Sequence, residues 1–511
     1  MGNLMERLRL NSTRFIFILK GLFVGSLVGL VVSIFRFIIE KSLILVKGLY
    51  QQMHTQPWLL GVWLVVMLLS CYLCGLLIKS DPNIKGSGIP QVEGQLEGTL
   101  EINWWSVFWK KFVGGILAIG SGLFLGREGP SIQLGAMLGQ GVAQATKQQG
   151  TGQRVLLAGG AAAGLSAAFN APIAATLFVL EEVYHNFSPL VWTTALSSAL
   201  AASWISSNFF GLDPVLNLAA KHVFPVQYYP YLILLGIVLG LLGYLYQYLT
   251  LNMPNFYQRL SFLKEPYYSV VPFVLVLFVG YFWPETLGGG NSLIVLTAHS
   301  SWTLQVILGY FVLRLLFSTL SYGSGVPGGI FLPILTLGAL LGALVFNGLN
   351  LWQLMPAYLL VNFIIYAMAG YFAGIGKAPF TAILLVTEMV GSLKHLLPLA
   401  VVSLVAYAVV DLLGGEPIYE AMLQKLRPQV KQCVGTYHDR LEIPVFVDSY
   451  LQDKQVRDIA WPKECLLVAI RRGENEQLPH GDTVIRSGDT LVFAIAHENR
   501  AWLKNEIEKL K

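Results

Sequence analysis

Three short segments combine glycine and proline in a way that suits anion binding. They read Gly86-Ser-Gly-Ile-Pro90, Gly126-Arg-Glu-Gly-Pro130 and Gly328-Gly-Ile-Phe-Leu-Pro333. Glycine lets a backbone approach a ligand closely, and proline suits the first turn of a helix. A helix start presents unpaired N–H groups and a partial positive charge, so several converging starts can hold an anion without a lysine or arginine. Together the three segments predict such a site.

Glu128 lies within the second segment, in an apolar part of the chain. An ionisable side chain is costly in an apolar membrane region and is by default a functional candidate. The alternative is a glutamate that only stabilises the dipole of a first helical turn. We favour the functional interpretation, which requires the segment to lie inside a membrane.

The composition agrees with a membrane protein. Of 511 residues, 55% are hydrophobic and 12% are charged, whereas a soluble domain averages about 25% charged residues. Charged residues become dense only from Gln424 onward, which indicates a soluble tail. Part of the net charge of +5 comes from Arg7, Arg9 and Arg14 before the first apolar stretch, and this favours a cytoplasmic N-terminus rather than a nucleic-acid partner.

Long apolar runs at 15–39, 58–78, 229–249 and around 358–372 can each cross a bilayer. The runs at 171–180 and 378–386 are too short to cross alone. Glycine- and proline-rich breaks between them cannot be lipid-exposed loops, because unpaired backbone groups in hydrocarbon cost several kcal/mol. We therefore expect interrupted helices that line a hydrated cavity.

The chain also repeats itself. Residues 130–139 match residues 333–342, and residues 170–181 match residues 377–388, in the same order. The alternative is coincidence between apolar segments of similar composition. Duplicated halves with interrupted helices indicate a transporter whose site lies near the bilayer midplane.

The three glycine- and proline-rich segments, in this order and spacing, resemble the signature loops of the CLC family of chloride channels and transporters. The resemblance covers roughly residues 21–423. The resemblance implies that chloride is held by the hydroxyl of Ser87 and by the backbone amides of Ile330 and Phe331. It also implies a tyrosine hydroxyl, for which Tyr419 is the candidate; a tyrosine at the membrane interface is the alternative. With a serine at position 87, the chain resembles the chloride-selective members of the family at this position.

By the same resemblance, Glu128 is the external gate, and Arg127 keeps its guanidinium paired and contributes framework or local potential. A carboxylate has the charge of chloride, so ionised Glu128 can occupy an anion site and leave it when protonated. Proton binding and anion binding then become coupled. Lys111 also has a family counterpart, and a snorkelling lysine is the expectation from sequence.

Proton exchange requires a second acid on the cytoplasmic side, which the resemblance places at the latter residue of the Glu181-Glu182 pair. The repeat offers an independent argument, because Glu181 has the counterpart Glu388 while Glu182 is matched by Met389. Glu181 and Glu388 are therefore expected to share a structural purpose. Glu182 is predicted to deliver protons toward Glu128.

The tail has the pattern of a small α+β domain. Residues 466–470 and 490–495 read as strands and residues 500–510 as a helix. Residues 478–492 resemble the TrkA C-terminal domain, a regulatory module of ion transporters. It could bind a small-molecule ligand or reinforce a dimer, and no Gly-x-Gly-x-x-Gly nucleotide motif precedes it.

The predicted fold is an all-α polytopic membrane domain of two inverted repeats, with a small α+β C-terminal domain. We assign residues 1–423 to transport, 424–437 to a linker and 438–511 to a cytoplasmic regulatory domain. The predicted function is proton-coupled chloride antiport by a homodimer without a cofactor. The alternatives are a voltage- or ligand-gated chloride channel of the same fold, a potassium system, which lacks a TVGYG filter, and an intramembrane enzyme, which lacks a His-Glu-x-x-His motif.

Overall fold

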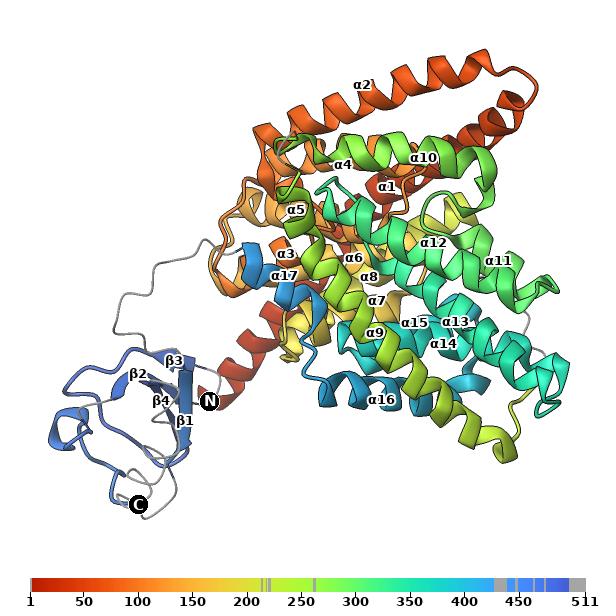
Figure 1. Ribbon diagram of the computed structural model, residues 1–511. Coiled ribbons are helices and arrows are strands. Elements are labelled where there is room, and N and C mark those ends of the chain that lie inside the picture. Colours follow the sequence, from red (N-terminus) through yellow and green to blue (C-terminus); the bar gives the residue numbers. More distant parts are fainter. Residues whose placement is uncertain are drawn as a thin grey trace. The chain divides into compact units, whose positions relative to one another are not determined.

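The computed structural model describes residues 2–212, 215–216, 218, 222–260, 263–426, 439–445, 449–462, 465–472 and 475–495. The chain forms two compact units, Met1–Leu426 and Arg427–Lys511 (Figure 1). The first is helical, and the second holds a small sheet. The predicted linker and the predicted helix at 500–510 lie largely or wholly outside the described residues.

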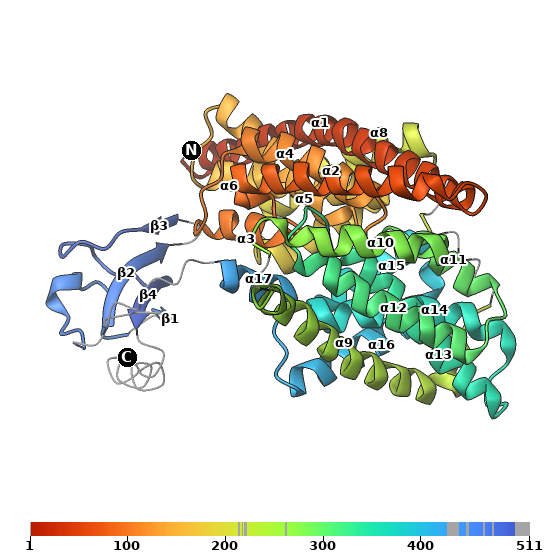
Figure 2. The same ribbon diagram turned by 45° about the horizontal axis from the view of Figure 1, so that its top comes forward.

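The first half of the helical unit contains α1 (Gly2–Met53), α2 (Trp58–Ser80), α3 (Ile89–Glu97), α4 (Trp104–Gly120), α5 (Glu128–Ala145), α6 (Thr151–Phe169), α7 (Pro172–Phe178) and α8 (Pro189–Phe210). The second half contains α9 (Tyr229–Gln258), α10 (Val270–Phe282), α11 (Asn291–His299), α12 (Leu304–Gly323), α13 (Phe331–Leu351), α14 (Leu360–Gly376), α15 (Pro379–Val390) and α16 (Leu396–Leu412), and α17 (Ile418–Leu426) follows. In Figure 2 the two halves, red to yellow and green to cyan, form neighbouring bundles.

Within the described residues, seven helical segments are long and apolar enough to span a membrane. They include Thr13–Met53, Trp58–Ser80, Val226–Gln258 and Ala357–Gly376, in agreement with the four apolar runs read from the sequence. Helix α7 is short, and α15 falls below the length needed to cross. The chain is therefore a multi-pass membrane protein with interrupted helices.

The duplication seen in sequence is present in the packing. Helix α5 packs on α6 as α13 packs on α14, and α6 packs on α8 as α14 packs on α16. Small residues make these approaches close: a side chain at Gly135 would overlap the backbone of Gly160, and one at Gly338 would overlap the backbone of Ala367. Such contacts let helices associate where lipid provides no hydrophobic drive.

A local two-fold relation joins the halves. Gly126 and Gly329, which occupy equivalent positions in the repeat, form an antiparallel bridge with two reciprocal N–H···O bonds of 2.7 Å each. Equivalent residues that exchange identical bonds in an antiparallel bridge are related by a local two-fold axis. Helices α7 and α15 also pack against each other across the halves.

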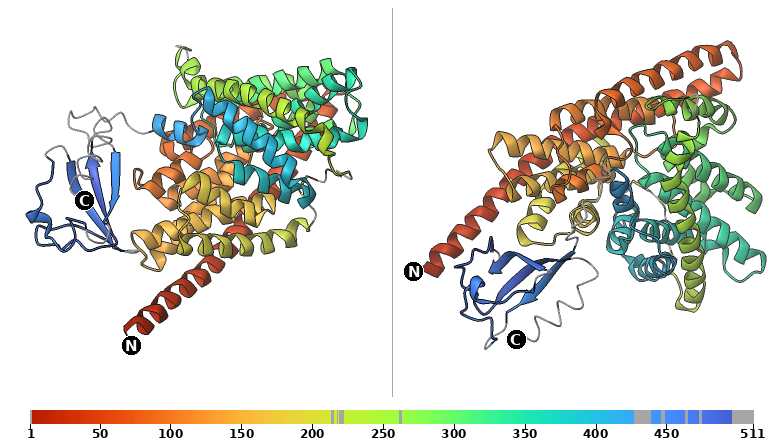
Figure 3. Two further views of the ribbon diagram at one scale, coloured as in Figure 1. Left: turned by 90° about the horizontal axis from the view of Figure 1, so that it is seen from below. Right: turned by 60° about the vertical axis from the view of Figure 1, so that its left-hand side comes forward.

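The C-terminal unit contains β1 (Asp439–Pro444), β2 (Cys465–Arg472), β3 (Asn475–Gln477) and β4 (Asp489–Ile495). They form an antiparallel sheet in the order β1-β4-β2-β3. Figure 3 shows this sheet, in blue, from two further sides. Ile443, Ile470, Leu491 and Phe493 lie in its core. The two strands predicted from the sequence are confirmed.

Candidate anion and proton site

The three glycine- and proline-rich segments come together inside the helical unit. Each begins a helix as predicted: α3 follows Gly88, α5 starts at Glu128 and α13 starts at Phe331. The bridge between Gly126 and Gly329 holds the last two starts side by side. The first segment joins them because the N–H of Gly328 donates to the carbonyl of Gly86 at 2.9 Å.

Ser87 is buried on this loop, directly before the start of α3. Gly88 has φ 88°, a left-handed conformation that favours glycine, and it turns the chain from Ser87 into the helix. The Ser87 Oγ accepts from the N–H of Ile89 at 3.3 Å, and it also lies within hydrogen-bonding range of the Tyr322 hydroxyl. A side chain at Gly129 would overlap Ser87, which shows how closely α5 approaches the loop.

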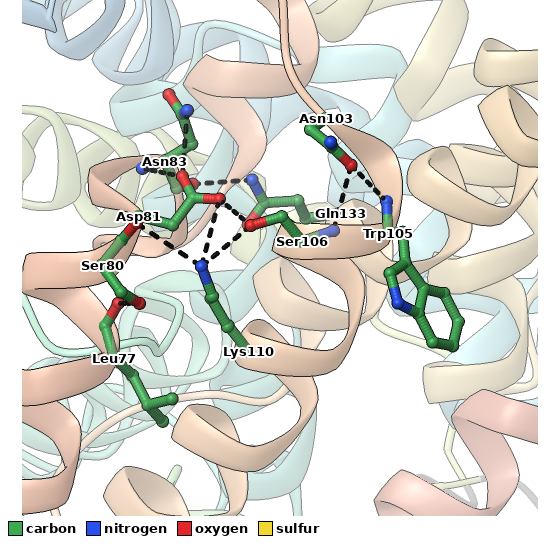
Figure 4. Close-up of polar contacts among 9 residues, drawn as sticks. All are labelled: Leu77, Ser80, Asp81, Asn83, Asn103, Trp105, Ser106, Lys110 and Gln133. Carbon is green, nitrogen blue, oxygen red and sulfur yellow. Dashed lines mark hydrogen bonds and ion pairs between the residues drawn. The ribbon is translucent and has the colours of Figure 1, made fainter.

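A polar network fixes the chain just before this loop (Figure 4). Asp81 accepts from the N–H and the side-chain amide of Asn83 at 3.2 and 3.1 Å, and from Ser106 at 2.5 Å. Lys110 lies 3.9 Å from Asp81 and donates to Ser106 at 2.9 Å. Gln133 of α5 donates to the carbonyl of Asn83 at 2.9 Å, so α4 and α5 both anchor the turn η1 (Pro82–Ile84).

Lys111 completes this anchor, and the snorkelling expected for it is wrong. Its side chain is fully buried and donates to the carbonyls of Ile84 at 2.9 Å and Gly86 at 2.7 Å. Sequence could not reveal these partners, because the two carbonyls lie on the loop before α3, whereas Lys111 lies on α4. Lys111 therefore fixes two carbonyls of the loop that carries Ser87.

Arg314 is the counterpart of Lys111 in the second repeat, and sequence reasoning missed it. It is fully buried on α12 and donates to the carbonyls of Thr286 and Gly288 at 2.8 Å each, and to that of Gly289. Gly289 corresponds to Gly86 in the repeat. Each half thus places a buried cation under the loop that begins its short helix, α3 or α11.

Tyr419 of α17 is buried, and its hydroxyl has no hydrogen-bond partner among the described residues. Its ring packs edge-on against Phe178 at 6.2 Å, and Phe178 packs against Phe331 at 5.9 Å. The hydroxyl lies within electrostatic range of both Glu128 and Glu182. A buried hydroxyl without a partner is costly, so Tyr419 stays a candidate donor to a bound anion.

Tyr322 is a second tyrosine at this place, and no sequence motif pointed to it. Its hydroxyl donates to the sulfur of Met422 at 3.1 Å, and it lies against Gly86. It therefore packs the Ser87 loop against α17. Ile330 and Phe331, by contrast, lie at the start of α13 as the motif predicted.

Glu128 is fully buried as the first residue of α5. Among the described residues, neither carboxylate oxygen forms a hydrogen bond of normal geometry. One oxygen lies against Gly126, and the backbone amide of Leu332 faces the group. An ionised Glu128 thus sits where the positive ends of α5 and α13 meet, the place expected of an anion.

Arg127 points away from Glu128 toward α1. Its Nη1 donates to Glu40 at 2.6 Å, and its Nε lies 3.9 Å from Glu128. Arg36 donates to the same Glu40 oxygen at 3.0 Å. The pairing expected for Arg127 is therefore present, but its partner on α1 could not be found from sequence.

Glu182 is buried on a single π-helical turn, η2 (Val179–Val183), which follows α7. Such turns often mark functional sites, because they re-aim a side chain within a helix. Glu93, Glu181 and Glu420 are the carboxylates nearest to it. Tyr419 lies within electrostatic range of both Glu182 and Glu128.

Glu181 and Glu388 share a structural purpose, as the repeat predicted. Glu181 accepts from the N–H groups of Phe380 and Thr381 at the start of α15, at 3.2 and 2.8 Å. Glu388 accepts from those of Ile173 and Ala174 at the start of α7, again at 3.2 and 2.8 Å. Each glutamate therefore caps the helix of the opposite repeat.

Known proteins resemble both units. Residues 66–411 match the family described as voltage gated chloride channel, and residues 440–507 match the TrkA-C domain. The H(+)/Cl(-) exchange transporter ClcA of Citrobacter koseri is 34% identical over 439 residues, covering 83% of this chain and 92% of the relative. The protein of the same name from Vibrio cholerae serotype O1 is 34% identical over 440 residues, covering 81% and 90%.

Solved structures agree with this comparison. A slow cyanobacterial Cl⁻/H⁺ antiporter superposes with a TM-score of 0.74 at 31% identity, over 81% of this chain and 98% of that one. A CLC-type fluoride/proton antiporter, at 22% identity and a TM-score of 0.65 over 78% and 95%, shares the fold. The chain therefore belongs to the CLC family, in its H⁺/Cl⁻ exchanger branch, and carries a C-terminal TrkA-C domain.

Proposed function

We propose that the protein exchanges chloride for protons across a membrane. The observation that carries this proposal is the position of Glu128. A fully buried carboxylate lies where two helix starts meet, beside the loop of Ser87 and near the unpartnered hydroxyl of Tyr419. The relatives and the solved structure with 31% identity carry the names of chloride/proton exchangers, which supports the same function.

Chloride is held by polar groups without a full positive charge. Ser87 and Tyr419 supply hydroxyl donors, and the amides of Ile330 and Phe331 supply the start of α13. Lys111 and the Asp81 network act indirectly, since they fix the Ser87 loop. Donors fixed in advance need no reorganisation when a dehydrated ion arrives, which favours binding.

Glu128 acts as the external gate. When it is ionised it competes with chloride for the amides at the start of α13, and when a proton neutralises it the anion takes its place. The two binding events are then linked by one free energy of coupling, so each ion affects the affinity for the other equally. Glu182 supplies or accepts the proton on the cytoplasmic side.

A proteoliposome experiment tests this function. An outward chloride gradient in sealed vesicles is expected to drive uphill proton movement, recorded with a pH electrode beside a chloride electrode. Glu182→Gln should stop the proton movement and leave chloride flux in place. Glu181→Gln is the matched control, since it neutralises the neighbouring residue, which caps α15, and should keep exchange.

The passive chloride channel makes the opposite prediction. In a channel the unmutated protein passes chloride at any proton gradient, and no proton moves against its own gradient. Chloride flux without coupled proton movement in the unmutated protein would therefore overturn the exchanger. Glu128→Ala, which removes the competing carboxylate, should make the exchanger behave in this uncoupled way.

The assembly belongs to the same proposal: a homodimer with one pathway in each subunit. The capping carboxylates Glu181 and Glu388 are only partly buried, and they lie beside the exposed side chains of Ile173 and Phe380. Charged groups facing hydrocarbon are costly, and a partner subunit over α7 and α15 would cover them. The mass of the detergent-solubilised protein from light scattering tests this, with a monomer contradicting it.

We also propose that the N-terminus and the C-terminal unit lie in the cytoplasm, because Arg7, Arg9 and Arg14 precede the first span. Residues 1–423 then form the transport domain, 424–437 the linker and 438–511 a regulatory domain that binds a small molecule or reinforces the dimer. Modification of single introduced cysteines by a membrane-impermeant reagent in intact cells tests the orientation. Labelling of the C-terminal unit from outside would contradict it.

A further inference from the structure

A groove of about 510 Å³ opens between α9, α10 and α12, and none of the candidate site residues lines it. Helix α12 packs against both α9 and α10 (Figure 2). Ligand pockets in proteins usually measure about 300–1,000 Å³, so the groove is large enough for a ligand. Its walls are almost entirely apolar and include Leu249, Met253, Phe256, Leu275, Leu316 and Leu320.

The groove opens to the outside of the helical unit. Phe256 and Leu316 on its rim are 50% and 54% exposed, whereas Phe317 at its floor is 5% exposed. Helices α9 and α12 are long and apolar enough to span a membrane, so this rim faces hydrocarbon. An empty groove would forfeit dispersion contacts along its walls. A hydrocarbon chain is the occupant that these walls fit.

Helix α9 carries the groove toward the headgroup layer. The helix has 30 residues, which makes it about 45 Å long at 1.5 Å per residue. The hydrocarbon core of a bilayer is only ~30 Å thick, so the ends of α9 reach the polar layers. The groove residues of α9 run from Tyr248 to Phe256, close to its C-terminal end.

A polar stripe runs beside the apolar residues of α9. Tyr248, Asn252, Asn255 and Arg259 follow one another at steps of three or four residues, so they share one helix face. Asn252 donates to the carbonyl of Tyr248 at 2.9 Å, and Asn255 is exposed. Amide and guanidinium N–H groups suit the ester and phosphate oxygens of a phospholipid.

The headgroup end of the groove carries an excess of positive charge. Arg259 caps the C-terminus of α9, and Lys264 lies between α9 and α10. Both are exposed, and neither forms an ion pair with another described residue. The neighbouring acid, Glu265, pairs instead with Lys85. A negatively charged headgroup would therefore be attracted to this end.

This end lies on the same side of the helical unit as the start of α1. Helices α1 and α2 run in opposite directions, joined by a short loop, so the end of α2 returns to that side (Figure 1). Tyr72 and Gly75 of α2 contact Tyr267, which directly precedes α10. With the proposed cytoplasmic N-terminus, the headgroup end lies in the cytoplasmic leaflet, whose anionic lipids attract basic residues.

We propose that the groove binds one acyl chain of an anionic phospholipid and that Arg259 and Lys264 hold its phosphate group. The apolar walls bind the chain of any phospholipid. The two cations supply the preference for a negatively charged headgroup. The site is separate from the anion and proton site, and only its assignment to the cytoplasmic leaflet rests on the proposed orientation.

Native mass spectrometry of the full chain in detergent tests the preference for charge. The lipid-stripped protein is titrated with phosphatidylglycerol or with phosphatidylethanolamine that carries the same acyl chains. Each cation near the headgroup favours an anionic lipid by about a factor of five. Phosphatidylglycerol is therefore expected to bind roughly tenfold or more tightly. Equal dissociation constants for the two lipids would overturn the proposal.

Variants of the cations locate the headgroup. Arg259→Gln should raise the dissociation constant of phosphatidylglycerol about fivefold and leave that of phosphatidylethanolamine unchanged. Lys79→Gln is the matched control, because it removes another exposed cation, at the end of α2 and outside the groove. It should change neither constant. An equal loss in the two variants would show unspecific attraction to the whole surface and reject the site.

Variants of the wall locate the acyl chain. Leu316→Trp fills the groove and should weaken the binding of both lipids about fivefold or more, because it displaces the chain from its contacts. Leu404→Trp places the same ring on α16, at a residue that is also 54% exposed, and should weaken neither. Phosphatidylglycerol with a diazirine in its acyl chain should label peptides of α9 and α12. Labels confined to other helices would contradict the proposal.

A second copy of the chain is the other possible occupant of the groove. In that case Leu316→Trp would change the number of subunits in the mass spectrum and leave lipid affinity unchanged, and the lipid site would be rejected. Lipid binding is measured without ion transport. A failure here therefore leaves the proposed exchange standing, and a failure of exchange in liposomes leaves the lipid site standing.

Discussion

At the scale of residues, the two candidate proton-carrying carboxylates, Glu128 and Glu182, have few hydrogen-bond partners among the described residues. In the described part of the chain, both buried oxygens of Glu128 and one buried oxygen of Glu182 lack a partner, whereas Glu181 and Glu388 each accept from two backbone N–H groups. A carboxylate that caps a helix is held in place by its backbone partners. One without fixed partners is free to exchange a proton and to move.

Tyr419 provides the first prediction at this scale. Tyr419→Phe removes only the buried hydroxyl that lacks a partner, so it should weaken chloride binding by the worth of one hydrogen bond to a charged group, about 1.5–3 kcal/mol. This corresponds to roughly a tenfold to hundredfold higher dissociation constant, measured by titration calorimetry in detergent.

A matched variant serves as the control for the Tyr419→Phe prediction. Tyr366→Phe removes another buried hydroxyl, which lies on α14 and bonds to His395 at 2.9 Å. It should lower thermal stability and leave chloride affinity unchanged. An unchanged affinity in Tyr419→Phe would remove Tyr419 from the site.

At the scale of elements, sequence predicted the interrupted helices well and their mutual contacts poorly. The helix starts at α3, α5 and α13 follow from glycine and proline, which act locally. The partners of Lys111, Arg127 and Arg314 come from segments far along the chain or from another helix, so no local pattern encodes them. The shared purpose of Glu181 and Glu388 was inferable from the repeat, but that each caps the opposite half required the structure.

The reciprocal caps give a prediction about stability. Glu388→Ala leaves the N–H groups of Ile173 and Ala174 without their acceptor, and loss of a helix N-cap costs about 0.5–2 kcal/mol of the free energy of unfolding. Glu181→Ala should cost a similar amount at α15. Thermal unfolding in detergent, followed by tryptophan fluorescence, measures both midpoints.

The double variant decides whether the caps act together. If α7 and α15 form one packed unit across the halves, the double variant should lose an amount different from the sum of the single losses. Strict additivity would show that each cap stabilises only its own helix start.

The buried cations beneath the loops give a further prediction. Lys111→Met removes both bonds to the carbonyls of Ile84 and Gly86, so the Ser87 loop should lose its fixed position and the chloride dissociation constant should rise about tenfold or more. Arg314→Met is the control from the other repeat. It should destabilise the protein without changing affinity at the central site, and calorimetry distinguishes the two.

At the scale of the whole molecule, a membrane unit and a small sheet unit are joined in one chain. Within the described residues of the sheet unit, Arg472 on β2 forms an ion pair with Asp489 on β4 and donates two bonds of 2.7 Å to it. The pair joins neighbouring strands at the end of the sheet. Its environment makes the stability of this unit depend on pH.

The direction follows from the pKa of Asp489. Burial alone would raise this pKa, but the bonds from Arg472 and the N–H of Arg486 outweigh burial, and the pKa lies below its ordinary value of 3.8. A depressed pKa in the folded state adds stability above the unfolded value, and this contribution is lost as pH falls through the folded value. The sheet unit should therefore weaken below about pH 4.

Hydrogen–deuterium exchange of the full chain measures this effect. After correction for the intrinsic pH dependence of exchange, peptides from β2 and β4 should lose protection as pH falls from 5 to about 3, while peptides from α5 and α13 keep theirs. Asp489→Asn should lower protection at neutral pH and remove the pH dependence, because the charge that Arg472 stabilises is gone. If Asp489→Asn and the unmutated chain lost protection in parallel, another group would control the acid response of the sheet.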